Sequence, residues 1–341
     1  MKNLTALLPI DRPIVQAPMF GVTTPAMVAA AASTGALGSL AIADLSPQKS
    51  IEQIRATRQL TNKPFAVNLF VHQVPEKTDE LRKQYTHTKS YIEDIAAKNG
   101  LTVRLPELDT LQITPYQEQI DALISEQCKI VSFTFGIPDP QSIQKLKANH
   151  TLLIGTCTSV AEAIALEQQG IDIICVQGIE AGGHRGSFIG LPQIGGISLL
   201  PQVYESVKTP LIYAGGIYNK NNMQAALALG AQAVQIGSLL IASKESALLP
   251  FEKERLKTVK ENEVVLTNTF SGRFARGINN AFIQSLASTD YILPYPYQNK
   301  LTAELRRIAR AHQNSEFVNI WIGQSIQSFS TDSTAAIINR L

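Results

Sequence analysis

The sequence predicts an α/β fold, a (β/α)8 barrel of the TIM type with a small helical cap, or substrate domain, formed by insertions. Short runs rich in β-branched residues recur with helix-like segments between them. Several lie about 20 to 28 residues apart, the size of one strand–helix unit. The runs are apolar throughout, as expected of parallel strands buried on both faces. A length of 341 residues suits one such barrel with insertions.

Eight runs have the composition and length of buried strands. Helix-like stretches such as Pro25–Ser33, Ser159–Gln169 and Asn221–Leu229 lie between them. Glycines stand where the C-caps of such helices are expected, at Gly35, Gly170 and Gly230. The expected strands are Ile14–Ala17, Leu37–Ser39, Phe65–Asn68, Ile130–Phe133, Leu152–Thr156, Ile173–Val176, Leu211–Ala214 and Ala233–Ile236.

An open, doubly wound sheet is the competing arrangement. Dinucleotide-binding sheets of that kind carry a Gly-x-Gly-x-x-Gly turn after the first strand. Here the first strand ends in Gln16-Ala17-Pro18-Met19 instead. The barrel is therefore favoured.

Two intervals interrupt the strand–helix rhythm. The stretch between Phe70 and Cys128 is charged and helix-prone, and a structureless loop of that length is uncommon. The chain after Ser243 is again polar and helical in pattern. We therefore expect residues 1–70, 125–242 and 315–341 to form the barrel, and residues 71–124 and 243–314 to form a helical substrate domain over its C-terminal mouth.

The composition favours a cytoplasmic protein that acts on small molecules. There are 30 basic and 28 acidic residues, and no basic cluster of the nucleic-acid-binding type. The N-terminus lacks a secretory signal pattern, and no apolar stretch reaches membrane-spanning length. Cys128, Cys157 and Cys175 lack metal-type spacing and are expected to be buried thiols. The histidines show no zinc spacing, so no metal is expected.

The ends of the last two expected strands indicate a phosphate site. Gly215 and Gly216 follow the seventh strand, and Gln235-Ile236-Gly237-Ser238 closes the eighth. Loops at these two places in a barrel commonly present backbone N–H groups to a phosphate. Any single glycine here could simply serve a tight turn. The pairing of the two patterns on adjacent loops favours phosphate binding.

Two amides stand where apolar strands meet the predicted pocket. Asn68 ends the third strand and Gln177 follows the sixth. An amide both donates and accepts hydrogen bonds, which suits a heteroaromatic ring with alternating N–H and C=O groups. With a phosphate site opposite and Pro18 and Met19 as an apolar wall, these residues fit flavin mononucleotide (FMN).

His184 is the candidate catalytic residue. It lies in the loop after the sixth strand among Gly182, Gly183 and Gly186, a stretch too glycine-rich to be core. Histidine is the side chain best suited to move a proton near neutral pH. A structural or exposed histidine is the alternative. No Gly-x-Ser-x-Gly elbow is present, which removes the commonest hydrolase interpretation.

Taken together, these motifs resemble the nitronate monooxygenase family, formerly called 2-nitropropane dioxygenase, over nearly the whole chain. The Glu-Ala-Gly-Gly-His block is typical of the wider flavin-dependent superfamily, and Arg185 with the Ser-Gly-Arg segment narrows the resemblance to the nitronate-oxidising members. The matching stretches are residues 16–19, 68–70, 131–136, 177–186, 214–217, 230–238 and 271–277.

The resemblance implies an FMN enzyme that oxidises nitronates with O2 to carbonyl compounds and nitrite. It implies that His184 is the catalytic base and that Thr134, Arg185, Tyr295, Tyr297 and Lys300 lie on the substrate side. Some relatives carry a second histidine where this chain has Thr134, which leaves substrate preference open. The expected cofactor-binding residues are Ala17, Pro18, Met19, Asn68, Gln177, Gly182, Gly183, Gly215, Gly216, Gln235, Ile236, Gly237, Ser238 and Trp321.

Two other functions share these features. An FMN-dependent enoyl-acyl-carrier-protein reductase has the barrel, the flavin and a Gly-Gly-His loop, but requires NAD(P)H. A non-catalytic flavoprotein or phosphate-binding barrel would make His184 incidental. Trp321 could equally be a core aromatic residue rather than part of a flavin pocket.

Overall fold

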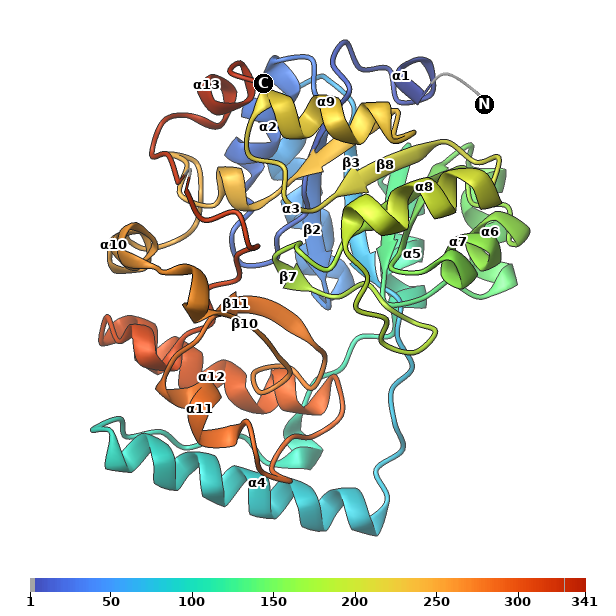
Figure 1. Ribbon diagram of the computed structural model, residues 1–341. Coiled ribbons are helices and arrows are strands. Elements are labelled where there is room, and N and C mark those ends of the chain that lie inside the picture. The colour runs from blue at the N-terminus through green and yellow to red at the C-terminus, as the bar shows by residue number, and fades with distance from the viewer. Residues whose placement is uncertain (1–3, 328) are drawn as a thin grey trace.

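Eight parallel strands form a nearly closed barrel in the computed structural model, which describes residues 4–327 and 329–341 (Figure 1). Their hydrogen-bonded order is β1-β9-β8-β6-β5-β4-β3-β2. The predicted fold class is confirmed. The strands are β1 (Ile14–Gln16), β2 (Gly38–Ala43), β3 (Phe65–Phe70), β4 (Ile130–Thr134), β5 (Leu152–Cys157), β6 (Ile173–Gln177), β8 (Leu211–Ala214) and β9 (Ala233–Ile236).

The seam between β1 and β2 closes partly through a side chain. Backbone pairing there is a single parallel bridge between Val15 and Leu37. The fully buried Gln16 extends it, because its amide oxygen accepts the Ser39 N–H at 2.9 Å and its Nε2 donates to the Ser39 carbonyl at 3.2 Å. The Gln16 amide thus takes the place of a backbone partner between β1 and β2. It satisfies the N–H and C=O of Ser39, which would otherwise be buried without hydrogen-bond partners.

Helices between the strands cover the outside of the barrel. Thr24, Ser46, Asp139, Ser159 and Asn219 cap five of them, each accepting a hydrogen bond from a backbone N–H of the first turn. These helices bury one side against the strands. The set is α2 (Pro25–Ser33), α3 (Pro47–Leu60), α5 (Tyr116–Ser125), α6 (Pro140–Ala148), α7 (Val160–Gln168), α8 (Gly196–Ser206), α9 (Lys220–Ala228) and the C-terminal α13 (Thr334–Ile338).

The interior of the barrel has its own apolar cluster. Alternate strand residues such as Val15, Ile130, Ile173 and Ile212 belong to it, because successive side chains of a strand point to opposite faces. Leu4, in the short helix α1 (Leu4–Leu7), belongs to the same cluster. The amino-terminal end of the barrel is therefore filled, and the open space lies at the carboxyl ends of the strands.

The insertions form a second unit below the barrel in Figure 1. It contains α4 (Asp79–Lys98), α10 (Pro250–Thr258), α11 (Ala281–Leu286) and α12 (Tyr297–Ala311). Short 3-10 turns are η1 (Leu108–Thr110), η2 (Ser238–Leu240), η3 (Glu261–Glu263) and η4 (Ser315–Phe317), of which η2 follows β9. The unit has a separate apolar core, whose members include Tyr85, Ile92, Phe270, Phe282, Leu301 and Phe317.

A three-stranded antiparallel sheet joins the two units, and the sequence did not predict it. Its strands are β10 (Val264–Thr267), β11 (Ala275–Ile278) and β7 (Gly183–His184). β11 contains a glycine and an arginine and shows no apolar alternation, so its sequence gives no strand signal. Because β7 comes from the barrel loop after β6, the cap's sheet holds the predicted catalytic histidine.

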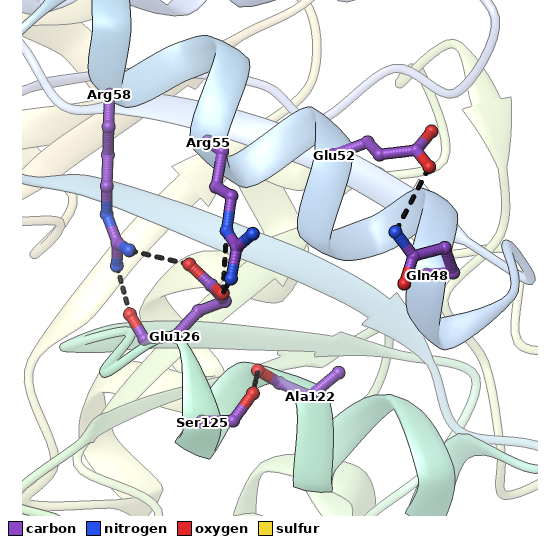
Figure 2. A network of polar contacts seen from close by, with 7 residues as sticks. All are labelled: Gln48, Glu52, Arg55, Arg58, Ala122, Ser125 and Glu126. Carbon is purple, nitrogen blue, oxygen red and sulfur yellow. Dashed lines mark hydrogen bonds and ion pairs between the residues drawn. The ribbon is translucent and has the colours of Figure 1, made fainter.

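An ionic contact joins two barrel helices, α3 and α5, where the chain re-enters the barrel after the first insertion (Figure 2). Glu126, at the C-cap of α5, accepts hydrogen bonds from Arg55 and Arg58 of α3. The carboxylate is nearly buried at 8% exposure, whereas Arg55 and Arg58 are 66% and 41% exposed. Solvent screens such a pair strongly, so the network fixes the packing of α5 on α3 at a modest gain in stability.

Candidate active site

A cavity opens at the carboxyl edge of the barrel and extends to the cap. The strand register brings its walls together, because Gln177 of β6 pairs with Ala214 of β8, which in turn pairs with Gln235 of β9. Barrel residues from β1 to β9 and cap residues from Phe270 to Arg306 line it. Most of the cofactor-site residues expected from the sequence meet here: Ala17, Pro18, Met19, Asn68, Gln177, Gly182, Gly183, Gly215, Gly216, Gln235, Gly237, Ser238 and Trp321.

One end of the cavity is lined by bare backbone. The N–H groups of Gly215, Gly216, Gly237 and Ser238 have no hydrogen-bond partner within residues 4–327 and 329–341. Gly215 and Gly216 have φ values of +130° and +67°, which strongly favour glycine. The Ser238 hydroxyl accepts from the Gly323 N–H at 2.8 Å, so its own proton remains available. This arrangement is a ready-made anion cradle.

The wall beside the cradle is apolar, with polar amides facing it. Asn68 Nδ2 donates to the hydroxyls of Ser132 at 2.9 Å and Thr134 at 3.3 Å, which orients the amide. Its Oδ1 accepts nothing from the rest of the described chain and remains free for a ligand N–H. Ala17 and Met19 form the apolar surface next to Gly237.

The loop that carries His184 is held from three sides. The Gln177 amide donates to the His184 carbonyl at 3.0 Å and accepts the Gly186 N–H at 2.9 Å. Glu162 accepts N–H groups from residues 188 and 189 just downstream. Cross-strand pairing of His184 with Ala275 of β11 supplies the third constraint. Gln177 lines the cavity, and its amide also shapes the loop.

The His184 ring lies among aromatic side chains and beside one hydroxyl. Its centroid is 5.4 Å from the Phe135 ring, 5.8 Å from the Trp321 ring and 6.0 Å from the Phe70 ring. Its Nε2 lies 2.8 Å from Ser271 Oγ. Burial of the imidazole, together with two nearby arginines, lowers the pKa of His184 to about 3. The ring is therefore neutral at physiological pH, with one nitrogen free to accept a proton.

Those two arginines place positive charge at this end, and the nearby Asp44 carboxylate offsets part of it. Arg273 lies over the Phe135 ring, 4.3 Å from its centroid, and donates to the Ser187 carbonyl. Arg306 donates only to neutral acceptors, including Asn299 and Thr302. Neither forms an ion pair with a carboxylate in the part of the chain that is described.

Both guanidinium groups are partly buried, and this partial burial disfavours their charge. Desolvation lowers the pKa of Arg273 and lowers that of Arg306 to about 10. A partly desolvated charge without an ion-pair partner is stabilised when an anion binds beside it. Arg306 lines the cavity directly. An anionic ligand is therefore favoured at the histidine end as well as at the backbone cradle.

Tyr295 supplies a hydrogen-bond donor to the same end. Its hydroxyl is buried and has no hydrogen-bond partner within the described residues, and burial raises its pKa well above the ordinary value. The phenol therefore stays protonated. Behind it lies His72, with a ring centroid 4.6 Å from that of Tyr295 and a pKa that desolvation lowers to about 4. No role was expected for His72, because it stands in a polar loop.

Of the substrate-side residues expected from the sequence, Thr134 and Tyr295 line the cavity and three others lie outside it. The Arg185 guanidinium turns away and donates to the carbonyls of Gly178 and Gln177. Lys300 forms an ion pair with Asp44 at 2.7 Å. The Tyr297 hydroxyl donates to the Pro75 carbonyl.

The expected cofactor residue Ile236 also lies outside the cavity. It packs in the barrel's outer core, while its neighbours Gln235 and Gly237 line the cavity. Strand alternation explains this, since the residue between two inward-facing positions faces outward.

Several cavity residues had no assigned role in the sequence analysis. Ser271 belongs to a block that resembles the family, but nothing in that block indicated its contact with His184. Others come from the cap or the C-terminal segment and have no local signature: Phe270, Asn299, Arg306, Asn319 and Ser325.

Other site types find no support among residues 4–327 and 329–341. No group of three His, Cys, Asp or Glu side chains is arranged to hold a metal ion there. No helix in this range is both long and apolar enough to cross a membrane. Cys175 lines the cavity floor, but burial raises the pKa of its thiol to about 12, which makes it a poor nucleophile.

Comparison with known proteins agrees with this geometry. The sequence model of the nitronate monooxygenase family matches residues 1–341. A probable nitronate monooxygenase of Staphylococcus aureus (strain Newman) is 38% identical, with 99% of this chain and 96% of the relative covered.

Solved structures give the same picture. A nitroalkane oxidase from Streptomyces ansochromogenes has a TM-score of 0.90 and 32% identity, covering 99% of this chain and 96% of that one. FabK from Thermotoga maritima has a TM-score of 0.77 and 27% identity, covering 99% and 93%.

The fold and these relatives define an oxidoreductase built on a (β/α)8 barrel. The chain belongs to the nitronate monooxygenase family.

Proposed function

We propose that this chain is an FMN-dependent nitronate monooxygenase, which oxidises alkyl nitronates such as propionate 3-nitronate with O2 to carbonyl compounds and nitrite. The observation that carries the proposal is the placement of a neutral His184 in a cavity with partly buried guanidinium groups at one end and a backbone anion cradle at the other. Family membership supports the same reaction.

The residues present fit FMN. The four unpaired N–H groups at Gly215, Gly216, Gly237 and Ser238 suit a terminal phosphate, and the turn after β1 carries no dinucleotide fingerprint. Asn68 Oδ1 is free to accept from a ring N–H, and Ala17 to Met19 offer an apolar face. When bound, the flavin supplies the electron-transfer chemistry, and the protein supplies placement and charge.

The substrate side of the cavity suits a nitronate. A nitronate is a carbanion whose negative charge rests largely on two oxygens. Arg306 and Arg273 would stabilise that charge electrostatically, and the protonated Tyr295 hydroxyl would donate to one oxygen. These groups are fixed before the substrate binds, so they need little reorganisation.

For a neutral nitroalkane, His184 would also remove the α-proton. Before substrate binds, the His184 imidazole is a weak base, because desolvation and the nearby arginines lower its pKa. A bound nitro compound develops negative charge on its oxygens as the proton leaves, and that charge favours the imidazolium. Proton transfer and charge stabilisation therefore support one another at this end of the cavity.

Two assays test the proposal. Purified protein mixed with propionate 3-nitronate in air, without NADH, should release nitrite, and acid-released flavin should be FMN by chromatography. Anaerobic mixing with NADH should leave the flavin colour unchanged over the same interval. Rapid bleaching by NADH without nitrite release would instead favour the enoyl-acyl-carrier-protein reductase. Recovery of FAD would contradict the phosphate assignment.

A further inference from the structure

We propose that Ser271 is a positioning residue that holds His184 as the Nε2–H tautomer, so that Nδ1 is the nitrogen that accepts the substrate's α-proton. This inference rests on the proposed function of His184 as a base. It adds which nitrogen acts and which residue of the second unit decides it.

The hydrogen bonds around Ser271 fix the direction of its hydroxyl. Its Oγ lies 3.0 Å from the Arg273 carbonyl, 3.3 Å from the Arg273 N–H and 2.8 Å from His184 Nε2. A hydroxyl has one proton, and a carbonyl can only accept. The Ser271 proton therefore goes to the Arg273 carbonyl, since two oxygens would otherwise meet without a proton between them.

The lone pairs of Oγ are then left for two donors. One accepts the backbone N–H of Arg273, and the other accepts a proton from Nε2 of His184. This assigns the ring proton to Nε2. Nδ1 has no hydrogen-bond partner in the part of the chain that is described, and the side chain lines the cavity. The unprotonated nitrogen is thus the one left for a ligand.

The turn that carries Ser271 is held rigidly, so the hydroxyl cannot easily adapt. Gly272 has φ +81°, and a Cβ there would lie 2.2 Å from the Leu293 carbonyl oxygen. Helix α12 anchors the turn, because Gln298 donates to the Thr269 carbonyl at 2.7 Å and Thr302 donates to the Phe270 carbonyl at 2.6 Å. The cap therefore sets the tautomer of a histidine that the barrel loop supplies.

The experiment combines a tautomer measurement with kinetics. In protein labelled with ¹⁵N in its five histidines, long-range ¹H–¹⁵N spectra distinguish Nε2–H from Nδ1–H rings, and the His184→Asn spectrum identifies the His184 signals. The wild type should show Nε2–H at His184. Ser271→Ala should show a mixture of tautomers, and Ser271→Thr, which keeps the hydroxyl, should restore the Nε2–H form.

Kinetics should follow the tautomer. Ser271→Ala should lower kcat for a neutral nitroalkane about 10-fold, a part of the 10²- to 10⁴-fold effect typical of a general base, and should lower turnover of the pre-formed nitronate less. Thr269→Val, which removes a buried hydroxyl from the same turn, is the matched control and should leave both the spectrum and kcat unchanged.

Two results would overturn the inference. One is an Nδ1–H ring in the wild type, and the other is an unchanged His184 spectrum in Ser271→Ala. The spectra need no substrate. If the protein oxidised no nitro compound but the spectra behaved as expected, the proposed function would fail while the role of Ser271 in holding the tautomer would stand.

Discussion

The two ends of the cavity offer different groups to a negatively charged ligand. The cradle end is built from barrel loops and offers backbone N–H groups at Gly215, Gly216 and Gly237. The Glu180 carboxylate lies beside those glycines, where it accepts hydrogen bonds from the Tyr213 hydroxyl and the Gly196 N–H. The histidine end takes its charge from the second unit, through Arg273 and Arg306.

This difference predicts different sensitivities. A backbone cradle carries no titratable group of its own, so it should respond to added side-chain volume and little to pH. The histidine end depends on side chains whose protonation and orientation are set by neighbours, so single-atom changes should alter its chemistry. Substitutions at each end can separate cofactor retention from turnover.

The largest effect should come from His184→Asn. This variant should retain FMN but lose turnover of neutral nitroalkanes by about 10²- to 10⁴-fold, because a carbon acid needs a base. Turnover of pre-formed nitronates should fall less, since their proton is already gone. Steady-state rates with both substrate forms, alongside flavin absorbance, measure this. Equal loss for both forms with FMN intact would show that His184 does not act mainly as a base.

Bulky replacement in the cradle should affect the other property. Gly216→Val places a β-branched residue at φ +67°, and Gly237→Leu adds a side chain whose Cβ would lie 3.4 Å from Ala17 and 3.6 Å from Met19. Both should weaken flavin retention, by roughly 10-fold or more if one phosphate contact is lost, at about 1.4 kcal/mol per factor of ten.

Flavin content after dialysis and the Kd on reconstitution report this loss. Gly195→Ala is the matched control, because Gly195 has φ −63° and open space around its Cα. Equal flavin content in all three variants would refute the cradle.

A smaller effect should appear in the pH dependence of stability. The pKa values of His184 and His72 fall to about 3 and about 4 in the folded protein, below the ordinary 6.5. Between these values the unfolded chain binds more protons, so their stabilising contribution is complete above about pH 6.5 and declines as the pH falls. Each histidine contributes a slope of up to about 1.4 kcal/mol per pH unit.

Replacing His72 by Gln should therefore flatten the decline. Urea unfolding of both proteins at pH 7 and pH 5 gives the comparison, and the variant should lose less free energy of unfolding between the two. Parallel losses in both proteins would mean that His72 is not held neutral in the native state.

The smallest effect should come from the ionic contact remote from the cavity. Glu126→Gln removes the charge that Arg55 and Arg58 share (Figure 2), and should lower Tm by only about 2 °C because both arginines are well exposed. Gln48→Ala, which removes the exposed contact to Glu52 on the same helix, should change Tm less still. Calorimetry measures both. A change in kcat or flavin content in Glu126→Gln would contradict its separation from the site.

Local sequence patterns were enough to predict the barrel and the meeting of the cradle glycines at one edge of it. Both rest on local patterns, since apolar runs mark parallel strands and parallel strands bring their carboxyl ends to one edge. Glycines at those ends therefore meet, as Gly215, Gly216 and Gly237 do. Because successive side chains of a strand point to opposite faces, the sequence also allowed the prediction that Ile236 lies outside the cavity. The same rule puts Arg185 on the opposite face from His184.

Which charges and hydroxyls lie near His184 depends on how the second unit packs on the barrel. Ser271 and Arg306 reach the cavity from 87 and 122 positions further along the chain, through the packing of the second unit on the barrel. No local pattern encodes such a contact. Lys300 is a second example. It forms an ion pair with Asp44 of the barrel, a partner that is apparent only once the two units are packed together.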